Sequence, residues 1–206
     1  TTINPYINNV DQIYPVKETN TKQRIVVGLK GRISEEVQFN FNGKYIKKDD
    51  EIFFINDYSD QLKNRFNIIY SDIEMFNAYG ELSFDFPSAF NLRLYGNYNH
   101  YIWLKSIEQA YHVPDFETGV SAAVKILPQL KVYSDATLMF GRYTFDALKM
   151  ESVKLDPVID VNLGAEYVVS QQLRAFLELN NLASQNYEIW NHYPVYGFHG
   201  MAGISY

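Results

Sequence analysis

The stretch "SQQLRAFLELNNLASQNYEIW", residues 170–190, decides the fold class of this chain. Four apolar residues alternate in it with four mostly polar ones: Leu173, Ala175, Leu177, Leu179 and Arg174, Phe176, Glu178, Asn180. Successive side chains of a β-strand point to opposite faces, so this two-residue period predicts a strand with one apolar and one largely polar face. The architecture then depends on which face points into the protein.

The same period recurs along almost the whole chain, in segments of about ten residues. No convincing long helical pattern interrupts these segments. The sequence therefore predicts an all-β, antiparallel, up-and-down arrangement of about nine long strands. The predicted strands are 24–33, 37–45, 76–86, 90–101, 118–126, 130–140, 158–167, 173–180 and 198–206.

Three features favour a transmembrane β-barrel over a soluble β-sandwich, which remains the alternative. The strands approach the 9–11 residues that a tilted spanning strand needs, about twice the usual soluble length. Aromatic residues gather near both ends of the strands, as in interfacial girdles. Short connections also alternate with long ones, as in outer-membrane barrels. The short ones are 34–36, 87–89, 128–129 and 170–172, and the long ones are roughly 47–71, 101–116, 142–157 and 182–196. In such a barrel the polar face looks inward.

Composition narrows the function classes. The 206 residues are 47% hydrophobic and carry a net charge of -6 without a basic cluster, which argues against nucleic acid as a partner. There is no cysteine, and the four histidines lack metal-ligand spacing. No phosphate-binding glycine loop and no G-x-S-x-G nucleophile motif occurs. The sequence indicates no enzyme, no cofactor and no metal site.

The direction of the strands bears on domain organisation. With nine strands, the first and the last run the same way, so the segment 1–22 would begin on the long-loop side. Bacterial barrels usually have an even strand number with both termini on the periplasmic side. We therefore expect residues 1–206 to be one barrel unit that forms the C-terminal portion of a larger barrel, with 1–22 as an extended segment or loop.

Several stretches resemble TonB-dependent receptors of the Bacteroidetes type. They are "LNNLASQNYEIWNHYPVYGFHGMAGISY" (179–206), "NPYINNVDQIYPVKETN" (4–20), "FFIND" (53–57) and "AYHVPDFETGVSAAVKI" (110–126). The resemblance implies a barrel in the outer membrane, surrounded by its lipid, that imports a small nutrient and is energised by a TonB-type protein. The family's N-terminal plug and energy-coupling box are not among these residues, and Tyr206 stands where the family often ends in Phe.

The ligand-binding candidates lie in the long loops and on the polar face. Aromatic rings beside amides suit sugars, aromatic chelates or peptides, although a girdle or packing role would use the same rings. The loop candidates are Tyr101, Trp103, Trp190 and Tyr193, and the polar-face candidates are Arg93 and Asn97. The leading interpretation is a nutrient receptor; a soluble all-β ligand-binding module and a structural barrel that anchors a surface complex remain open.

Overall fold

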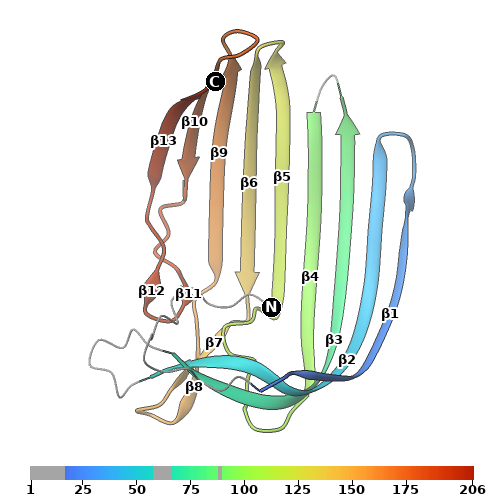
Figure 1. Cartoon of the computed structure of the whole chain (residues 1–206), viewed down its shortest axis with the longest axis vertical. Helices are drawn as coiled ribbons and strands as arrows, with labels where there is room; N and C mark the ends of the chain where they lie inside the picture. The colour runs from blue at the N-terminus through green and yellow to red at the C-terminus, as the bar shows by residue number, and fades with distance from the viewer. Residues whose placement is uncertain (1–16, 58–65, 88–89) are drawn as a thin grey trace.

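The computed structural model describes residues 17–57, 66–87 and 90–206, and all structural statements below concern these ranges. Nine strands form one antiparallel sheet, and four short strands form two hairpins (Figure 1). In spatial order the sheet contains β1 (Asn20–Arg32), β2 (Val37–Asn56), β3 (Phe66–Phe86), β4 (Phe90–Leu104), β5 (Phe116–Leu127), β6 (Leu130–Phe140), β9 (Val158–Val168), β10 (Arg174–Asn180) and β13 (His199–Ser205). This confirms the predicted all-β, up-and-down arrangement.

The sheet is a single layer along most of its length. Its apolar side chains are consequently exposed: Val27 and Ile204 each expose 72% of their surface, and Leu29 exposes 66%. A water-soluble domain would bury such a face against a second layer. A sheet that meets lipid on its apolar face has no need of one, because hydrocarbon takes the place of the core. The described residues contain no helix long and apolar enough to cross a membrane.

Aromatic side chains form a row at each end of the apolar face. Directly paired residues share a face, and Tyr98 pairs with Phe116, which pairs in turn with Phe140. Near the opposite end the rings of Phe86 and Phe90 lie 4.9 Å apart between their centroids. The two rows occupy the positions of the two interfacial girdles of a membrane barrel.

The long connections are more ordered than the sequence indicated. Residues 47–71 were predicted as a loop, but β2 continues to Asn56 and β3 begins at Phe66. A register shift between Lys48 and Glu51, with a left-handed backbone at Asp50 (φ 53°), changes the parity of β2 and so hides its period. The connections 142–157 and 182–196 each contain a hairpin: β7 (Tyr143–Asp146) with β8 (Glu151–Lys154), and β11 (Glu188–Trp190) with β12 (Tyr193–Pro194).

The first strand begins a few residues earlier than the sequence indicated. Residues 20–22 of the expected segment 1–22 already belong to β1, where Asn20 pairs with Asp49. Residues 1–16 lie outside the described residues, as do 88 and 89 of the turn 87–89. The other short connections, 34–36, 128–129 and 170–172, join consecutive strands of the sheet as expected.

The extensions of β2 and β3 leave the sheet and run across towards β7, β8 and β11 (Figure 1). A small buried core, with Phe53, Ile73, Met75 and Ala110 at its centre, forms where they bend. At the far end Asn56 and Asn191 are joined by two hydrogen bonds: Asn56 Nδ2 donates to the Asn191 carbonyl (3.1 Å), and Asn191 Nδ2 donates to Asn56 Oδ1 (2.9 Å). We call this packed layer of extensions and hairpins the mouth layer.

The two outermost strands pair on one side only within the described residues. β1 pairs with β2, β13 pairs with β10, and β1 and β13 do not pair with each other. β1 and β13 therefore each present an open edge within the described residues. In hydrocarbon each unpaired backbone group costs several kcal/mol, so these edges need partner strands in a membrane.

Replacing Leu177 with Arg tests which face meets lipid. Leu177 lies on the apolar face opposite Ala165 and Ala202, and a lipid-facing Arg near the midplane costs about 2–4 kcal/mol. We expect Leu177→Arg to lower the fraction of assembled receptor, measured as heat-modifiable migration on a gel. The control is Glu178→Arg, which places the same charge on the polar face. Greater loss in the control would invert the face assignment.

Candidate functional site

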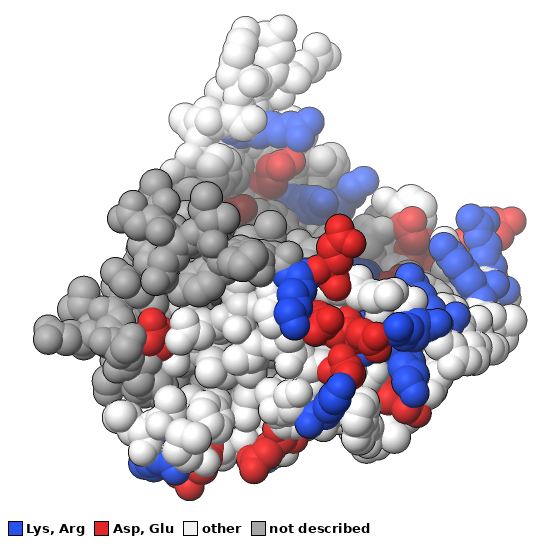
Figure 2. Space-filling model, turned by 60° about the horizontal axis from the view of Figure 1, so that its bottom comes forward, with Lys and Arg blue, Asp and Glu red and all other residues white. Residues whose placement is uncertain are grey.

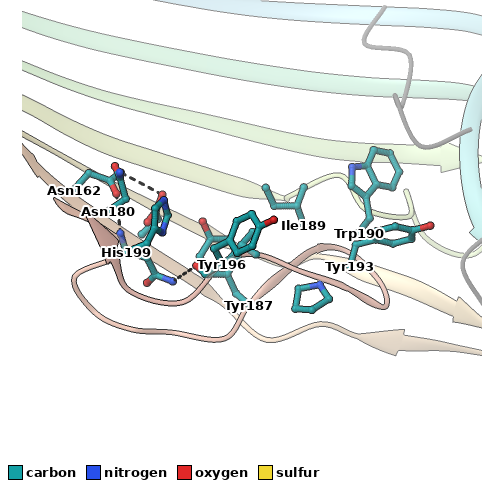
Figure 3. Close-up of a pocket in the computed structure, with 12 residues that line it drawn as sticks. Asn162, Asn180, Tyr187, Ile189, Trp190, Tyr193, Tyr196 and His199 are labelled. Atoms are coloured by element: carbon teal, nitrogen blue, oxygen red, sulfur yellow. Dashed lines mark hydrogen bonds between the residues drawn. The ribbon is translucent and has the colours of Figure 1, made fainter. Parts of the chain in front are cut away.

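The hairpin β11–β12 folds back over the polar face of β9, β10 and β13 and forms an open cavity of about 590 Å³ with them (Figure 3). This volume lies within the range of small-molecule sites. The strands contribute Asp160, Asn162, Asn180 and His199 to its wall. The turn after β10, the hairpin and the segments beside it contribute Asn181, Tyr187, Ile189, Trp190, Tyr193, Pro194, Val195 and Tyr196.

The turn that follows β10 depends on Asn181, the second asparagine of the Leu-Asn-Asn-Leu motif. Its backbone is left-handed (φ 50°), a conformation that Asn tolerates better than most residues. Its buried Nδ2 donates to the carbonyls of Gln185 (2.9 Å) and Tyr196 (3.0 Å), and its Oδ1 accepts the Gln185 N–H (3.1 Å). Its own N–H donates to Asn162 Oδ1 (2.9 Å). The Asn181 side chain therefore ties both ends of the loop together, and its backbone N–H ties the turn to the strand wall.

Trp190 is held by rings from three other segments. Its ring centroid lies 5.4 Å from that of Phe54, 5.6 Å from that of Phe66 and 5.0 Å from that of His112. Tyr193 packs on Phe66 from the neighbouring position, at 5.5 Å between centroids. Aromatic pairs at these distances each add about 0.5–1.5 kcal/mol beyond area burial. The aromatic end of the cavity is therefore fixed before any ligand arrives.

His112 is a buried base in this aromatic cluster. Its Nδ1 lies 3.1 Å from the Phe54 carbonyl oxygen. Burial lowers the pKa of His112 to about 4, and the charge of Arg142 acts in the same direction. A ring with this pKa is neutral at pH 7 and donates from Nδ1 to the carbonyl.

Arg142 anchors the hairpin from behind. It is only 2% exposed, and its guanidinium donates to the carbonyls of Glu188 (2.6 Å), Ile189 (3.2 Å) and Asp156 (3.1 Å). Burial lowers the pKa of Arg142, but a guanidinium stays charged at any relevant pH. Because its donors are directed at backbone carbonyls, Arg142 stabilises the loop and does not line the cavity.

The cavity itself carries little charge. Its wall contains one carboxylate, Asp160, and one imidazole, His199, and no Lys or Arg among the described residues. Burial, followed by the charge of Asp160, raises the pKa of the Tyr187 phenol to about 12, so this group is a neutral hydroxyl. The described residues also contain no group of three or more His, Cys, Asp or Glu placed to hold a metal ion.

The charges of the mouth layer lie elsewhere and are paired with one another. Figure 2 shows basic and acidic side chains interleaved on the end of the molecule that is turned forward. Among them, Lys22 lies 3.0 Å from Asp49, and Lys105 lies 2.9 Å from Asp72. The hydrogen bond from Lys105 holds the pKa of the Asp72 carboxyl below its usual range. These exposed pairs contribute little stability and leave no strong field of one sign.

The structure brings two of the six predicted ligand-binding residues together. Trp190 and Tyr193 both line the cavity. Trp103 lies opposite Glu74 on the other face of the sheet, with 46% of its surface exposed, and Tyr101 packs on Phe53 at 6.3 Å between ring centroids. Their positions match the girdle or packing role weighed for these rings.

Arg93 and Asn97 lie on the polar face, as the alternation indicated, and bind neighbouring side chains. Arg93 Nη2 donates to Glu81 Oε2 (2.6 Å), and Asn97 Oδ1 accepts a hydrogen bond from Asn77 Nδ2 (2.7 Å). Neither residue lines the cavity under the hairpin.

Sequence reasoning missed the asparagines of the cavity. Asn162, Asn180 and Asn181 were not among its candidates, although the alternation had placed the first two on the polar face. The available signal was that Asn162 lies near the start of one strand and Asn180 ends the adjacent strand, so both lie at the end of the sheet beside the Tyr- and Trp-rich loop. Without the fold-back of β11–β12, nothing joined them to its aromatic rings.

The structure superposes on solved structures of outer-membrane receptors and transporters. The copper transporter OprC superposes with a TM-score of 0.70 at 13% identity, over 92% of this chain and 30% of that one. The siderophore receptor PiuA from Acinetobacter baumannii gives 0.66 at 14% identity, over 88% and 28%. The pyoverdine outer-membrane receptor FpvA from Pseudomonas aeruginosa PAO1, bound to pyoverdine, gives 0.66 at 13%, over 88% and 29%.

These similarities show the fold. The chain has the barrel fold of TonB-dependent outer-membrane receptors, as the sequence resemblance implied, and it spans less than a third of each structure compared. No protein-family model matches the sequence, and no curated protein matches it.

Replacing Asn181 with Ala should loosen the loop 182–197. The change removes three side-chain hydrogen bonds and leaves buried backbone groups without partners, at about 1–3 kcal/mol for each unsatisfied group. We expect faster amide hydrogen exchange in this loop and unchanged exchange in β9. The matched control is Asn186→Ala, because Asn186 is exposed in the same loop. Equal exchange in both variants would contradict the anchoring role.

The mouth layer should loosen in acid because of His112. The pKa of His112 in the folded protein is below the unfolded value near 6.5. Its contribution to the free energy of unfolding is therefore complete above pH 6.5 and is lost as the pH falls towards 4. The full loss is roughly 3 kcal/mol. We expect Trp190 fluorescence to change between pH 6.5 and 4, and His112→Asn to abolish the change, since Asn tolerates the positive φ here. An unaltered transition in the variant would assign it to another group.

Proposed function

We propose that this chain is the C-terminal portion of an outer-membrane receptor that takes up a small nutrient. The observation that carries the proposal is a single-layer sheet whose apolar face is exposed between two aromatic rows and whose outer strands have open edges. A soluble ligand-binding module would bury that face. The superposition on less than a third of each receptor chain supports the same proposal.

The open edges indicate how the chain would be completed. In a membrane, β1 and β13 require partner strands, which the remainder of a larger barrel would supply. We propose that a plug and a TonB-type energy-coupling protein act on the complete receptor, as the family resemblance implies. Outer-membrane lipid would contact the apolar face, and the nutrient would enter from the mouth layer.

The cavity under β11–β12 is the proposed point of nutrient contact. It lies on the polar face, which looks into the barrel, at the end of the sheet where the long connections gather (Figures 1 and 3). Loops on a rigid scaffold are where binding residues concentrate. Trp190 and Tyr193 offer aromatic surface there in a fixed position, so a ligand would not have to order them.

Replacing Trp190 with Ala in the intact receptor should reduce uptake. Uptake is measured in cells that carry the receptor gene and in a deletion strain, with radiolabelled neutral oligosaccharides and ferric chelates as probes. We expect a loss of about tenfold, because an aromatic contact surface of this kind contributes about 1–2 kcal/mol. Trp103→Ala is the control, since Trp103 lies on the opposite face. Heat-modifiable migration reports assembly separately.

Two outcomes would count against this proposal. Normal uptake by a well-assembled Trp190→Ala receptor would remove the cavity from the uptake route. Equal uptake by the deletion strain and the wild type for every probe would contradict the transport function and favour a structural barrel.

A further inference from the structure

We infer that an apolar groove in the mouth layer is a docking site for the N-terminal segment of this chain, residues 1–16. The groove has a volume of about 790 Å³ and lies between the extension of β2 and β3, the connection that follows β4 and the hairpin β7–β8. Its lining residues differ from those of the cavity under β11–β12. The inference goes beyond the proposed function and does not depend on which solute the receptor takes up.

The wall of the groove is mainly apolar. Its apolar lining consists of Ile55, Ile68, Ile69, Ile107, Phe145 and Met150. The groove belongs to the mouth layer, beyond the lipid-facing part of the sheet, so water would fill it if no other group did. Contact between water and a contiguous apolar surface is unfavourable, and such a surface with a polar rim marks a docking site.

The two charged residues of the lining are already engaged within the protein. Lys105 Nζ donates to Asp72 Oδ2 (2.9 Å), and Glu108 Oε2 accepts a hydrogen bond from Ser152 Oγ (2.8 Å). The groove therefore selects its occupant by apolar contact and not by charge. An uncharged apolar segment satisfies this requirement.

The described chain begins on the wall of this groove. The backbone N–H of Lys17 donates to the hydroxyl of Tyr70 (3.0 Å). Lys17 Nζ lies 5.3 Å from the centroid of the Tyr70 ring and 3.5 Å from Asp50 Oδ1. Tyr70 is itself one of the lining residues. The N–H of Lys17 belongs to its peptide bond with Val16, so this hydrogen bond places the point of entry of the segment at the edge of the groove.

The segment has the composition that the groove requires. Residues 1–16, which lie outside the described residues, have the sequence "TTINPYINNVDQIYPV". This sequence contains no Lys or Arg, and Asp11 is its only acid. Four extended residues span at most about 14 Å, so the residues that can reach the groove directly from Lys17 are 13–16. Three of these four are Ile13, Tyr14 and Val16, which are apolar or aromatic.

The covalent connection favours this occupant over a separate molecule. A short tether gives the segment an effective concentration in about the millimolar range at the groove. Pro15 also fixes one backbone dihedral angle, so the segment loses less conformational entropy when it docks. A free partner has neither advantage.

Docking would join two parts of the mouth layer. Ile55 and Ile68 lie on the extension of β2 and β3, whereas Phe145 lies on β7 and Met150 lies in the turn before β8. A segment that contacts both walls stabilises their packing against each other. We therefore expect residues 13–16 to restrain the hairpin β7–β8 as well as the extension.

Photocross-linking in the intact, detergent-solubilised receptor identifies the occupant. The photoreactive residue p-benzoylphenylalanine replaces Met150, which lines the groove and is 75% exposed, so the hairpin accommodates the change. The control replaces Leu148, which is 72% exposed on the same hairpin but is not a lining residue. We expect mass spectrometry to find cross-links to residues 10–16 from position 150 and none to that segment from position 148.

A variant without the apolar groups of the segment tests their effect. In the triple variant Ile13→Ser, Tyr14→Ser and Val16→Ser, we expect amide hydrogen exchange in 66–70 and 143–146 to become about tenfold faster, because apolar contacts that restrain both walls are lost. Exchange in β9 is the internal reference and should not change. Leu148→Ser is the matched control and should leave exchange in all three regions unaltered. Heat-modifiable migration reports assembly of each variant.

Three results would overturn the inference. They are cross-links from position 150 only to lipid or to another protein, no cross-link from it to residues 1–16, and unaltered exchange in an assembled triple variant. None of these readouts involves uptake of a solute. Failure of this inference would therefore leave the proposed function standing, and failure of the uptake experiments would leave this inference standing.

Discussion

The backbone hydrogen-bond ladder of the nine-stranded sheet is the constraint on which the rest of the structure depends. In hydrocarbon every N–H and C=O must be paired within the protein, and a sheet does this only through its neighbouring strands. The strands must therefore be long, consecutive and antiparallel, as β1 to β6, β9, β10 and β13 are. The same requirement explains why one face can be wholly apolar without a second layer behind it.

Beyond the aromatic row next to the mouth layer, backbone groups no longer have to be paired through neighbouring strands, and loops and short hairpins replace the sheet. In the mouth layer, side chains take over the task of satisfying backbone groups. Arg142 pairs with three carbonyls, Asn181 pairs with two carbonyls and one N–H, and Asn56 pairs with the carbonyl of Asn191. This layer has a small buried core of its own, formed by Phe53, Ile73, Met75 and Ala110. It can hold a cavity because its loops need not follow the ladder.

This division also explains what the sequence could and could not predict. The two-residue period follows from strand geometry, so fold class, strand number and face assignment were accessible. The period failed at residues 47–57, where the shift at Asp49–Asp50 and the consecutive apolar residues of "IFFIN" concealed the continuation of β2. Trp103 and Trp190 look alike in the sequence, since both follow an isoleucine in an aromatic-rich stretch, yet they lie on different sides of the sheet. Only the tertiary contacts of Trp190 with Phe54 and Phe66 distinguish them.

The charged groups of the polar face are also paired with one another. Along the strands its groups are satisfied by one another: Arg93 binds Glu81, and the Tyr133 hydroxyl donates to Glu178 (2.9 Å). Such a wall has few hydrogen-bonding groups free to select a ligand. At the rim the pattern changes, because the β11–β12 hairpin places fixed aromatic rings beside the polar groups of β9, β10 and β13. The strand wall and the rim therefore differ: the charged groups along the wall are paired with one another, whereas the rim combines polar side chains with fixed aromatic rings around a cavity.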